Sequence, residues 1–202
     1  MNSKFTPINQ NNLVMVAGGT GMVGKSIVKK LKSKNYKKIL SPSSDELDLR
    51  NQTDVNNYLK EHKPDYIFIC AGKVGGIKAN DTLKAEFLYD NLMIQSNLIN
   101  GAYINKINNL MYFASSCIYP KFSKQPIKEK CLLTGELEKT NEGYALAKIA
   151  GIKMCESFNN QYNTDFRAVM PTNLYGPNDN YDDQNSHVLA ALIKKIQYAK
   201  IN

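Results

Sequence analysis

The chain has 202 residues, of which 43% are hydrophobic and 22% are charged. These fractions are typical of a globular protein and exclude a disordered tail or a collagen-like repeat, and the length favours one domain with a sizeable core. The net charge is +8, but Lys outnumbers Arg by 24 to 2. Because Arg makes the bidentate contacts to phosphate and guanine, we interpret the charge as a compositional bias and expect no nucleic-acid partner.

Targeting and redox features favour a cytoplasmic location. No apolar run approaches the roughly 18 to 20 residues that a membrane span needs, and the polar start of the chain lacks a signal-peptide pattern. The four cysteines are scattered, without a CxxC pair or a zinc-like spacing. We therefore expect a reducing compartment, no membrane association and no metal site. The cysteines are Cys70, Cys117, Cys131 and Cys155.

Short apolar runs and amphipathic stretches alternate along the whole chain. We predict strands at 13–17, 38–40, 66–70, 110–114 and 166–170, separated or followed by helices from 22, at 54–62, at about 83–103, at about 144–162 and at 188–199. Such alternation predicts an α/β fold built from βαβ units, with a doubly wound parallel sheet covered on both faces. Ligands of such sheets bind where loops leave the carboxyl ends of the strands.

A glycine cluster lies between the first predicted strand and the first predicted helix. Gly18, Gly21 and Gly24 are spaced one residue more widely at the start than in the common dinucleotide fingerprint. Glycines at these positions allow a tight turn and a close approach of the backbone to a pyrophosphate, and the helix N-terminus attracts the anion. The loop therefore predicts dinucleotide binding, although glycine-rich turns can also simply join two elements.

The end of the second predicted strand bears on the choice of nicotinamide cofactor. An Asp or Glu at this place binds the ribose 2′-hydroxyl of NAD. The segment here is Ser41-Pro42-Ser43-Ser44, and the first acidic residue is Asp45. Hydroxyl groups tolerate a 2′-phosphate and nearby lysines favour it, so we expect NADP, although no Arg supports the assignment.

A serine, a tyrosine and a lysine form the candidate catalytic set. Tyr144 and Lys148 are four residues apart on one helix face, a pair that a chain rich in both residues also produces by chance. Ser115 follows the fourth predicted strand, about 30 residues earlier. A lysine ammonium can lower the pKa of a phenol from about 10 toward neutrality, so that the phenol exchanges a proton with an alcohol oxygen held by the serine. The set predicts hydride transfer at a carbonyl.

These motifs together resemble the extended short-chain dehydrogenase/reductase superfamily, in its NAD-dependent epimerase/dehydratase family. Four longer runs, at 71–77, 115–120, 148–153 and 170–177, resemble the members that use NADPH to convert GDP-4-keto-6-deoxy-D-mannose to GDP-L-fucose. The resemblance implies a Rossmann-like domain and a bifunctional 3,5-epimerase and 4-reductase. It also implies a homodimer formed by the two long helices at 83–103 and 144–162.

The resemblance assigns roles to individual residues. Cys117 and His187 correspond to the acid and base that invert the carbons beside the ketone, for which a thiol and an imidazole have suitable pKa values. Ser115, Tyr144 and Lys148 complete the catalytic set, and Asn173 and Lys195 correspond to substrate-binding positions. The implied cofactor contacts are Gly18, Gly19, Thr20, Gly21, Met22, Val23, Gly24, Ala71, Gly72, Phe113, Ala114, Ser115, Lys148, Pro171, Asn173, Leu174 and His187.

The chain departs from the family pattern in two residues and in length. Lys195 stands where the family usually has Arg, and Gly143 stands where Pro commonly precedes the catalytic tyrosine. Relatives continue into a small C-terminal lobe that binds the sugar nucleotide. We therefore expect residues 1–202 to form the NADP-binding domain, with the start of that lobe at about 175–202 and the rest of the lobe largely missing.

Two alternative functions remain open. One is another nucleotide-sugar epimerase or dehydratase that recycles its NAD, which the Cys117/His187 pair and the missing acid directly after the second strand disfavour. The other is a truncated, non-catalytic dinucleotide-binding module, against which the presence of Tyr144, Lys148 and Cys117 argues.

Overall fold

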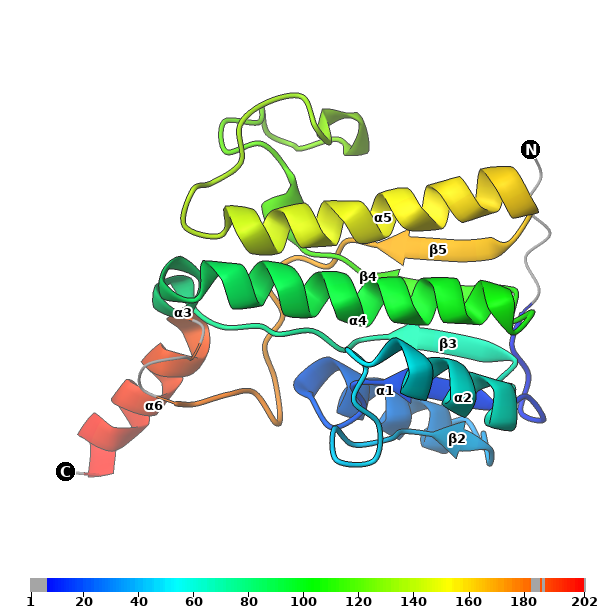
Figure 1. Cartoon of the computed structure of the whole chain (residues 1–202). Helices are drawn as coiled ribbons and strands as arrows, with labels where there is room; N and C mark the ends of the chain where they lie inside the picture. The colour runs from blue at the N-terminus through cyan, green and yellow to red at the C-terminus, as the bar shows by residue number, and fades with distance from the viewer. Residues whose placement is uncertain (1–6, 183–185, 187, 202) are drawn as a thin grey trace.

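The computed structural model describes residues 7–182, 186 and 188–201 (Figure 1). Within this part, parallel strands form a sheet of order β2-β1-β3-β4-β5. This is the predicted α/β fold, and its doubly wound, Rossmann-like sheet is confirmed. The strands are β1 (Val14–Ala17), β2 (Ile39–Leu40), β3 (Tyr66–Ile69), β4 (Asn109–Phe113) and β5 (Asp165–Val169).

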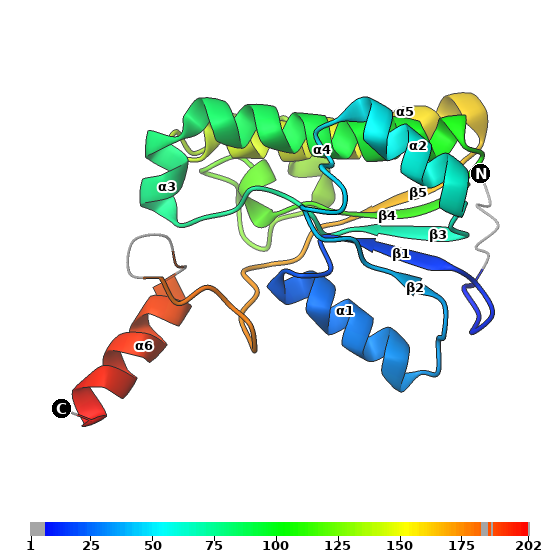
Figure 2. The ribbon, with the colours of Figure 1, turned by 60° about the horizontal axis from the view of Figure 1, so that its bottom comes forward.

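Helices cover both faces of the sheet. Figure 2 shows α1 on one face and α2, α4 and α5 on the other, whereas α6 projects from the carboxyl edge of the sheet. The α-helices are α1 (Met22–Ser33), α2 (Gln52–His62), α3 (Ile77–Thr82), α4 (Lys84–Ile104), α5 (Glu142–Tyr162) and α6 (Val188–Ile201), with short 3₁₀ turns at η1 (Ser116–Ile118) and η2 (Glu129–Cys131). No helix in the described ranges combines the length and apolarity needed to cross a bilayer.

Alternate residues of the strands supply two hydrophobic clusters, one on each face. Met15 and Ala17 of β1 face the larger cluster, which α2, α4 and α5 complete, whereas Val14 and Val16 face the smaller cluster under α1. All four residues of β1 are fully buried. Burial on both faces explains why this strand is a continuous apolar run instead of an alternating one.

The two longest helices, α4 and α5, lie side by side over the sheet (Figure 1). Gly151 of α5 packs directly on Tyr112 of β4, since a Cβ atom at this glycine would lie 2.5 Å from the tyrosine ring. The missing side chain therefore brings the middle of α5 close to β4. This contact lies about one helical turn from Lys148, so it also determines how closely the part of α5 that carries the lysine approaches β4.

The predicted boundaries differ from the observed ones by one to two residues at most positions. Helix α2 begins at Gln52 instead of residue 54, because the Asn51 side chain caps it by accepting from the Thr53 and Asp54 N–H groups. The short helix α3 was not predicted. It has six residues and follows Gly75-Gly76, whose carbonyl groups accept from the Asn80 side chain.

Candidate active site

The glycine loop lies against the loop that follows β3. Gly18 has φ +81°, and a Cβ atom there would lie 2.6 Å from the Ala71 backbone. Gly24 packs on Gly18, with a hypothetical Cβ at 2.1 Å from the Gly18 carbonyl oxygen. The fold itself therefore requires glycine at these two positions.

Gly21 differs from the other two glycines of the motif. It is the N-cap of α1, and a Cβ atom there would make only an ordinary contact, 3.5 Å from the Gly18 carbonyl oxygen. No side chain caps α1, and its first turn contains no acidic residue. The N–H groups of the first turn are thus available to an anion, which the helix dipole would attract. Thr20 and Gly21 are exposed beside them, and Met22 and Val23 are half-buried.

The segment that follows β2 packs on the glycine loop and contains the carboxylate of Glu46. A Cβ atom at Gly19 would lie 1.9 Å from Ser41 Oγ. Glu46 Oε2 accepts from the Ser43 N–H at 2.7 Å, and hydrogen bonds from Ser43 lower the pKa of Glu46. The Ser-x-x-Glu spacing of a capping box was the available signal. The Glu46 carboxylate is thus engaged by the backbone of the segment that follows β2.

Ser115, Cys117, Tyr144 and Lys148 come together at the carboxyl end of β4. The Ser115 side chain lies close to both Tyr144 and Cys117 and acts to lower the pKa of each. Lys148 is only 4% exposed, and its Nζ donates to the Phe113 carbonyl oxygen at 3.0 Å while lying 5.6 Å from the centroid of the Tyr144 ring. Two residues that directly follow β4 and two from α5 thus form one cluster, here named the Ser115 pocket, in which Lys148 is buried and the other three residues are half-buried.

Burial dominates the electrostatics of this pocket. It lowers the pKa of Lys148 to about 8, an effect opposed by Cys117 and Cys70. Burial also raises the pKa of the Cys117 thiol, against the hydrogen bond from Ser115 and the charge of Lys148.

The expected lowering of the Tyr144 pKa is not found. Burial raises the pKa of this phenol, Cys117 adds to the effect, and the hydrogen bond with Ser115 opposes it. The ammonium of Lys148 lies over the face of the tyrosine ring and hydrogen-bonds to a backbone carbonyl, so its charge is directed at the ring and the carbonyl group. Tyr144 is therefore protonated at neutral pH and can donate a proton to an oxygen atom.

The loop after β3 completes this side of the pocket. A Cβ atom at Gly72 would lie 2.8 Å from Asn91 Oδ1 and 3.5 Å from Lys148 Nζ. Asn91, which is buried in α4, accepts from the Lys73 N–H at 3.1 Å and donates to the Lys73 carbonyl at 3.0 Å. This amide fixes the backbone beside Lys148. Asn91 was not predicted from the sequence, because a lone Asn in a long helix carries no specific signal.

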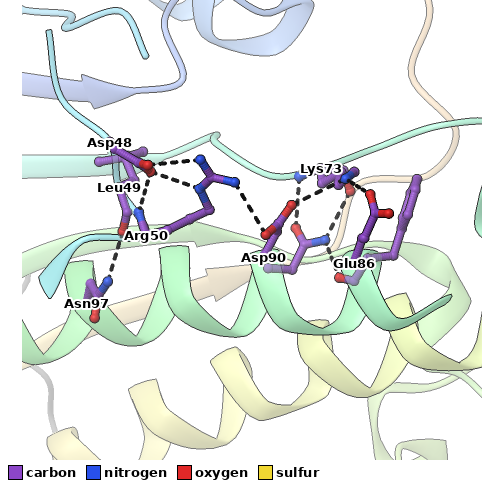
Figure 3. A network of polar contacts seen from close by, with 9 residues as sticks. Asp48, Leu49, Arg50, Lys73, Glu86, Asp90 and Asn97 are labelled. Atoms are coloured by element: carbon purple, nitrogen blue, oxygen red, sulfur yellow. Dashed lines mark hydrogen bonds and ion pairs between the residues drawn. The ribbon is translucent and has the colours of Figure 1, made fainter. Parts of the chain in front are cut away.

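Ion pairs on α4 hold the same loop from outside (Figure 3). Asp90 lies between two cations, with Arg50 Nη1 at 3.6 Å and Lys73 Nζ at 3.3 Å. Arg50 also pairs with Asp48 at 2.9 Å, and Lys73 pairs with Glu86. The network joins the loop before α2 and the loop after β3 to one face of α4.

The remaining predicted site residues lie elsewhere or outside the described part. Phe113 ends β4, and Ala114 follows it, buried, with its N–H donating to the Val169 carbonyl of β5. Pro171, Asn173 and Leu174 follow β5, where Asn173 is exposed. Lys195 is exposed on α6, and the structure gives it no contact with the Ser115 pocket. His187 lies outside the described residues.

Comparisons with known proteins define the family. Residues 14–201 match the model of the NAD dependent epimerase/dehydratase family. The chain belongs to this family. It is 49% identical to GDP-L-fucose synthase of Escherichia coli K12 over 92% of this chain and 58% of that protein.

Solved structures of family members superpose closely on the chain. A GDP-mannoheptose C4 reductase from Campylobacter jejuni with NADP bound has a TM-score of 0.90 and 39% identity, covering 96% of this chain and 58% of that one. A GDP-L-fucose synthetase from Naegleria fowleri bound to NADP has a TM-score of 0.87 and 29% identity, covering 96% of this chain and 64% of that one. The chain spans about three fifths of the length of the curated relatives it matches.

Proposed function

We propose that this family member uses NADPH to convert GDP-4-keto-6-deoxy-D-mannose to GDP-L-fucose, by epimerisation at C3 and C5 and reduction at C4. The observation that carries the proposal is the cluster at the carboxyl end of β4, where the Ser115 side chain lies close enough to Tyr144 and Cys117 to lower the pKa of both. A proton donor for the carbonyl oxygen and a thiol for the neighbouring carbons thus lie beside the same serine. The likeness to the E. coli GDP-L-fucose synthase supports the choice of substrate.

The residues present fit a dinucleotide. The first-turn N–H groups of α1, with Gly18, Gly19, Thr20, Gly21, Met22, Val23 and Gly24, would hold the pyrophosphate. The nicotinamide half would lie along residues at the ends of the next strands and on α5, namely Ala71, Gly72, Phe113, Ala114, Ser115, Lys148, Pro171, Asn173 and Leu174. The family resemblance adds His187 to this set. The cofactor, when bound, supplies a hydride. The hydroxyl groups of the Ser41–Ser44 segment and the NADP-bound relatives support NADPH.

Tyr144, Ser115 and Lys148 would carry the reduction. As a hydride reaches C4, negative charge develops on the carbonyl oxygen and the C=O π bond breaks. The protonated Tyr144 donates its phenolic proton to this oxygen, while Ser115 holds the oxygen in place. Lys148, which lies over the Tyr144 ring and donates to the Phe113 carbonyl oxygen, would hold the tyrosine ring in position.

Cys117 and His187 would carry the two epimerisations. The C4 ketone acidifies the C–H bonds at C3 and C5, so one group removes a proton to form an enolate and the other returns a proton to the opposite face. Ser115 and Lys148 both favour the thiolate form of Cys117. The role of His187 comes from the family resemblance.

The substrate nucleotide would bind toward the C-terminal part of the chain. We propose residues 1–202 as the NADP-binding domain and about 175–202 as the start of the substrate-binding lobe, with Asn173 and Lys195 contributing to the substrate site. The share of the curated relatives that the chain spans supports this division.

The proposed assembly is a cytoplasmic homodimer. Tyr89 of α4 is 61% exposed and Leu146 of α5 is 44% exposed, so the adjacent long helices present apolar surface that an isologous four-helix contact would cover. The four cysteines are free thiols, in keeping with a reducing compartment. Light scattering at micromolar concentration should give the mass of a dimer, and a monomer would contradict the proposal.

A C4 reductase without epimerase activity is the second candidate. The raised pKa of Cys117 favours it, because a protonated thiol is a poor base. The similarity to the C4 reductase from C. jejuni points the same way.

An isotope experiment in D₂O separates the two candidates. The protein is incubated with GDP-4-keto-6-deoxy-D-mannose and NADPH, and NADPH oxidation is followed together with deuterium at C3 and C5. Tyr144→Phe should lose about 10²–10⁴ in the rate of reduction while exchange persists, and Cys117→Ser should lose exchange by a similar factor. Cys131→Ser, in the η2 loop, is the matched control and should change neither. Normal exchange in Cys117→Ser would show that Cys117 is not the exchanging group. NADPH oxidation without exchange in the unsubstituted protein would leave a plain reductase, and NADPH binding without oxidation would leave a non-catalytic module.

A further inference from the structure

Two buried polar side chains lie beneath Lys148 and belong to no motif. Tyr112 of β4 is fully buried, and Gln95 of α4 is 2% exposed. The Tyr112 hydroxyl donates to Gln95 Oε1, and Gln95 Nε2 donates to the Ala147 carbonyl oxygen. Since the Ala147 carbonyl can only accept, the orientation of the Gln95 amide is determined, and so is the direction of the Tyr112 hydroxyl.

The face of the Tyr112 ring is turned toward the lysine. Lys148 Nζ lies 4.9 Å from the centroid of this ring, closer than the 5.6 Å to the Tyr144 ring. Both distances are within the range at which an aromatic face attracts a cation. The ammonium thus has two aromatic faces and the Phe113 carbonyl oxygen around it.

The ring of Tyr112 is held on two sides. Gly151 of α5 packs on it, with a hypothetical Cβ only 2.5 Å from the ring, and Gln95 anchors its hydroxyl group. Ala147, which accepts from Gln95, directly precedes Lys148 in α5. One chain of contacts therefore joins α4, β4 and α5 at the root of the lysine side chain.

The other titratable groups around Lys148 give its charge little support. Cys70 follows β3, and burial raises its pKa to about 12; Cys117 lies in η1, and burial raises its pKa as well. Tyr144 on α5 and Tyr112 on β4 are buried phenols with raised pKa values. Helix α4 contributes the uncharged Gln95 and Asn91, and no carboxylate influences the Lys148 pKa in the described part of the chain.

We propose that Tyr112 and Gln95 are positioning residues for Lys148. The Tyr112 ring stabilises the ammonium in a buried site and directs it toward the Phe113 carbonyl, and Gln95 fixes the ring. The proposal rests on the proposed role of Lys148 in hydride transfer, but its effect on the charge of Lys148 can be measured without substrate or cofactor.

The test is an NMR titration of the protein labelled with ¹³C at the lysine Cε atoms, with the Lys148 signal assigned from Lys148→Arg. Tyr112→Leu removes the aromatic face and should lower the Lys148 pKa by about 0.4 to 1.5 pH units, which is the cation–π contribution of a desolvated site. Tyr112→Phe keeps the aromatic face, so the Lys148 pKa in this variant should stay close to that of the wild-type protein. Gln95→Leu should lower the pKa by a smaller amount. Tyr103→Leu is the control, because this ring stacks on Tyr162 at the far end of α4.

Each outcome bears on the proposal. An unchanged Lys148 pKa in Tyr112→Leu overturns the role of the ring, and an unchanged pKa in Gln95→Leu overturns the anchoring role, even where Tyr112→Leu does not fold. A shift in Tyr103→Leu as large as in Tyr112→Leu would show a general loss of packing, which also overturns it. In the active protein, the alkaline limit of NADPH oxidation should move with the NMR pKa. If the Lys148 pKa falls in Tyr112→Leu as expected but the unsubstituted protein does not oxidise NADPH, only the proposed function is contradicted.

Discussion

The pocket around Lys148 and the helix α6 depart from ordinary burial in opposite ways. Polar side chains are buried in the pocket, whereas α6 exposes apolar side chains such as Ile196, which is 69% exposed. In the pocket, Asn91, Gln95 and Lys148 each have hydrogen-bond partners within the described chain. The apolar surface of α6 has no comparable cover among the described residues. The buried polar groups of the pocket are therefore paired within this chain, and their loss should have larger effects than substitutions on α6.

Among the polar side chains of the pocket, the largest expected loss of stability is at Asn91. Asn91→Leu removes a side chain that accepts from the Lys73 N–H and donates to the Lys73 and Phe87 carbonyl groups. We expect the free energy of unfolding to fall by about 2–4 kcal/mol, because two groups of a half-buried loop lose their partners. Urea denaturation measures it. Asn105→Ala, which removes one bond at the partly exposed end of α4, should cost less than about 1 kcal/mol; an equal loss would show that the Lys73 contacts are not special.

The next effect is expected at Gly151. Gly151→Ala places a methyl group 2.5 Å from the Tyr112 ring, so α5 must move away from β4 or the ring must turn. Overpacking of this kind costs about 1–3 kcal/mol, and calorimetry should show it as a lower Tm. Gly135→Ala is the matched control, because its Cβ would lie 3.3 Å from the Pro120 side chain in a surface loop. If both variants melt alike, Gly151 does not set the contact between α5 and β4.

The contrast also shows how far the sequence alone could lead. The strands and the glycine loop were predicted because apolar periodicity and Gly spacing are local signals. These signals imply a parallel sheet, and its topology predicted that Ser115, Tyr144 and Lys148 lie close together. Gln95 and Asn91 were missed, since their partners are 52 and 18 residues away and a polar residue in a helix usually indicates a solvent-facing position. The direction of the Tyr144 pKa shift was wrong because it depends on burial, which spacing does not report.

Removal of the Lys148 charge should increase the free energy of unfolding, in contrast to the losses expected at Asn91 and Gly151. Its pKa is lowered from 10.5 to about 8, so the unfolded chain binds more protons between these values. The wild-type protein should therefore gain stability relative to Lys148→Met as the pH rises from about 8 to about 10.5, and below pH 8 the difference should be constant. At neutral pH we expect Lys148→Met to be more stable than the wild-type protein by about 1–3 kcal/mol. The lost hydrogen bond to the Phe113 carbonyl reduces this gain. Denaturation of both proteins across this pH range measures the difference, and a pH-independent difference would contradict the lowered pKa.

The smallest effect is expected on α6. Ile196→Ser exchanges an apolar side chain that is already mostly in water, so little transfer free energy is lost and the free energy of unfolding should change by less than about 0.5 kcal/mol. Leu98→Ala in α4 is the opposite case, because Leu98 is fully buried in the larger cluster, and it should cost about 2–5 kcal/mol. Parallel urea denaturation compares the two. A loss above about 1 kcal/mol in Ile196→Ser would mean that a contact in solution covers this face of α6. The apolar side chains of α6 would then be buried by a binding partner, whereas the polar side chains of the pocket are buried within the chain.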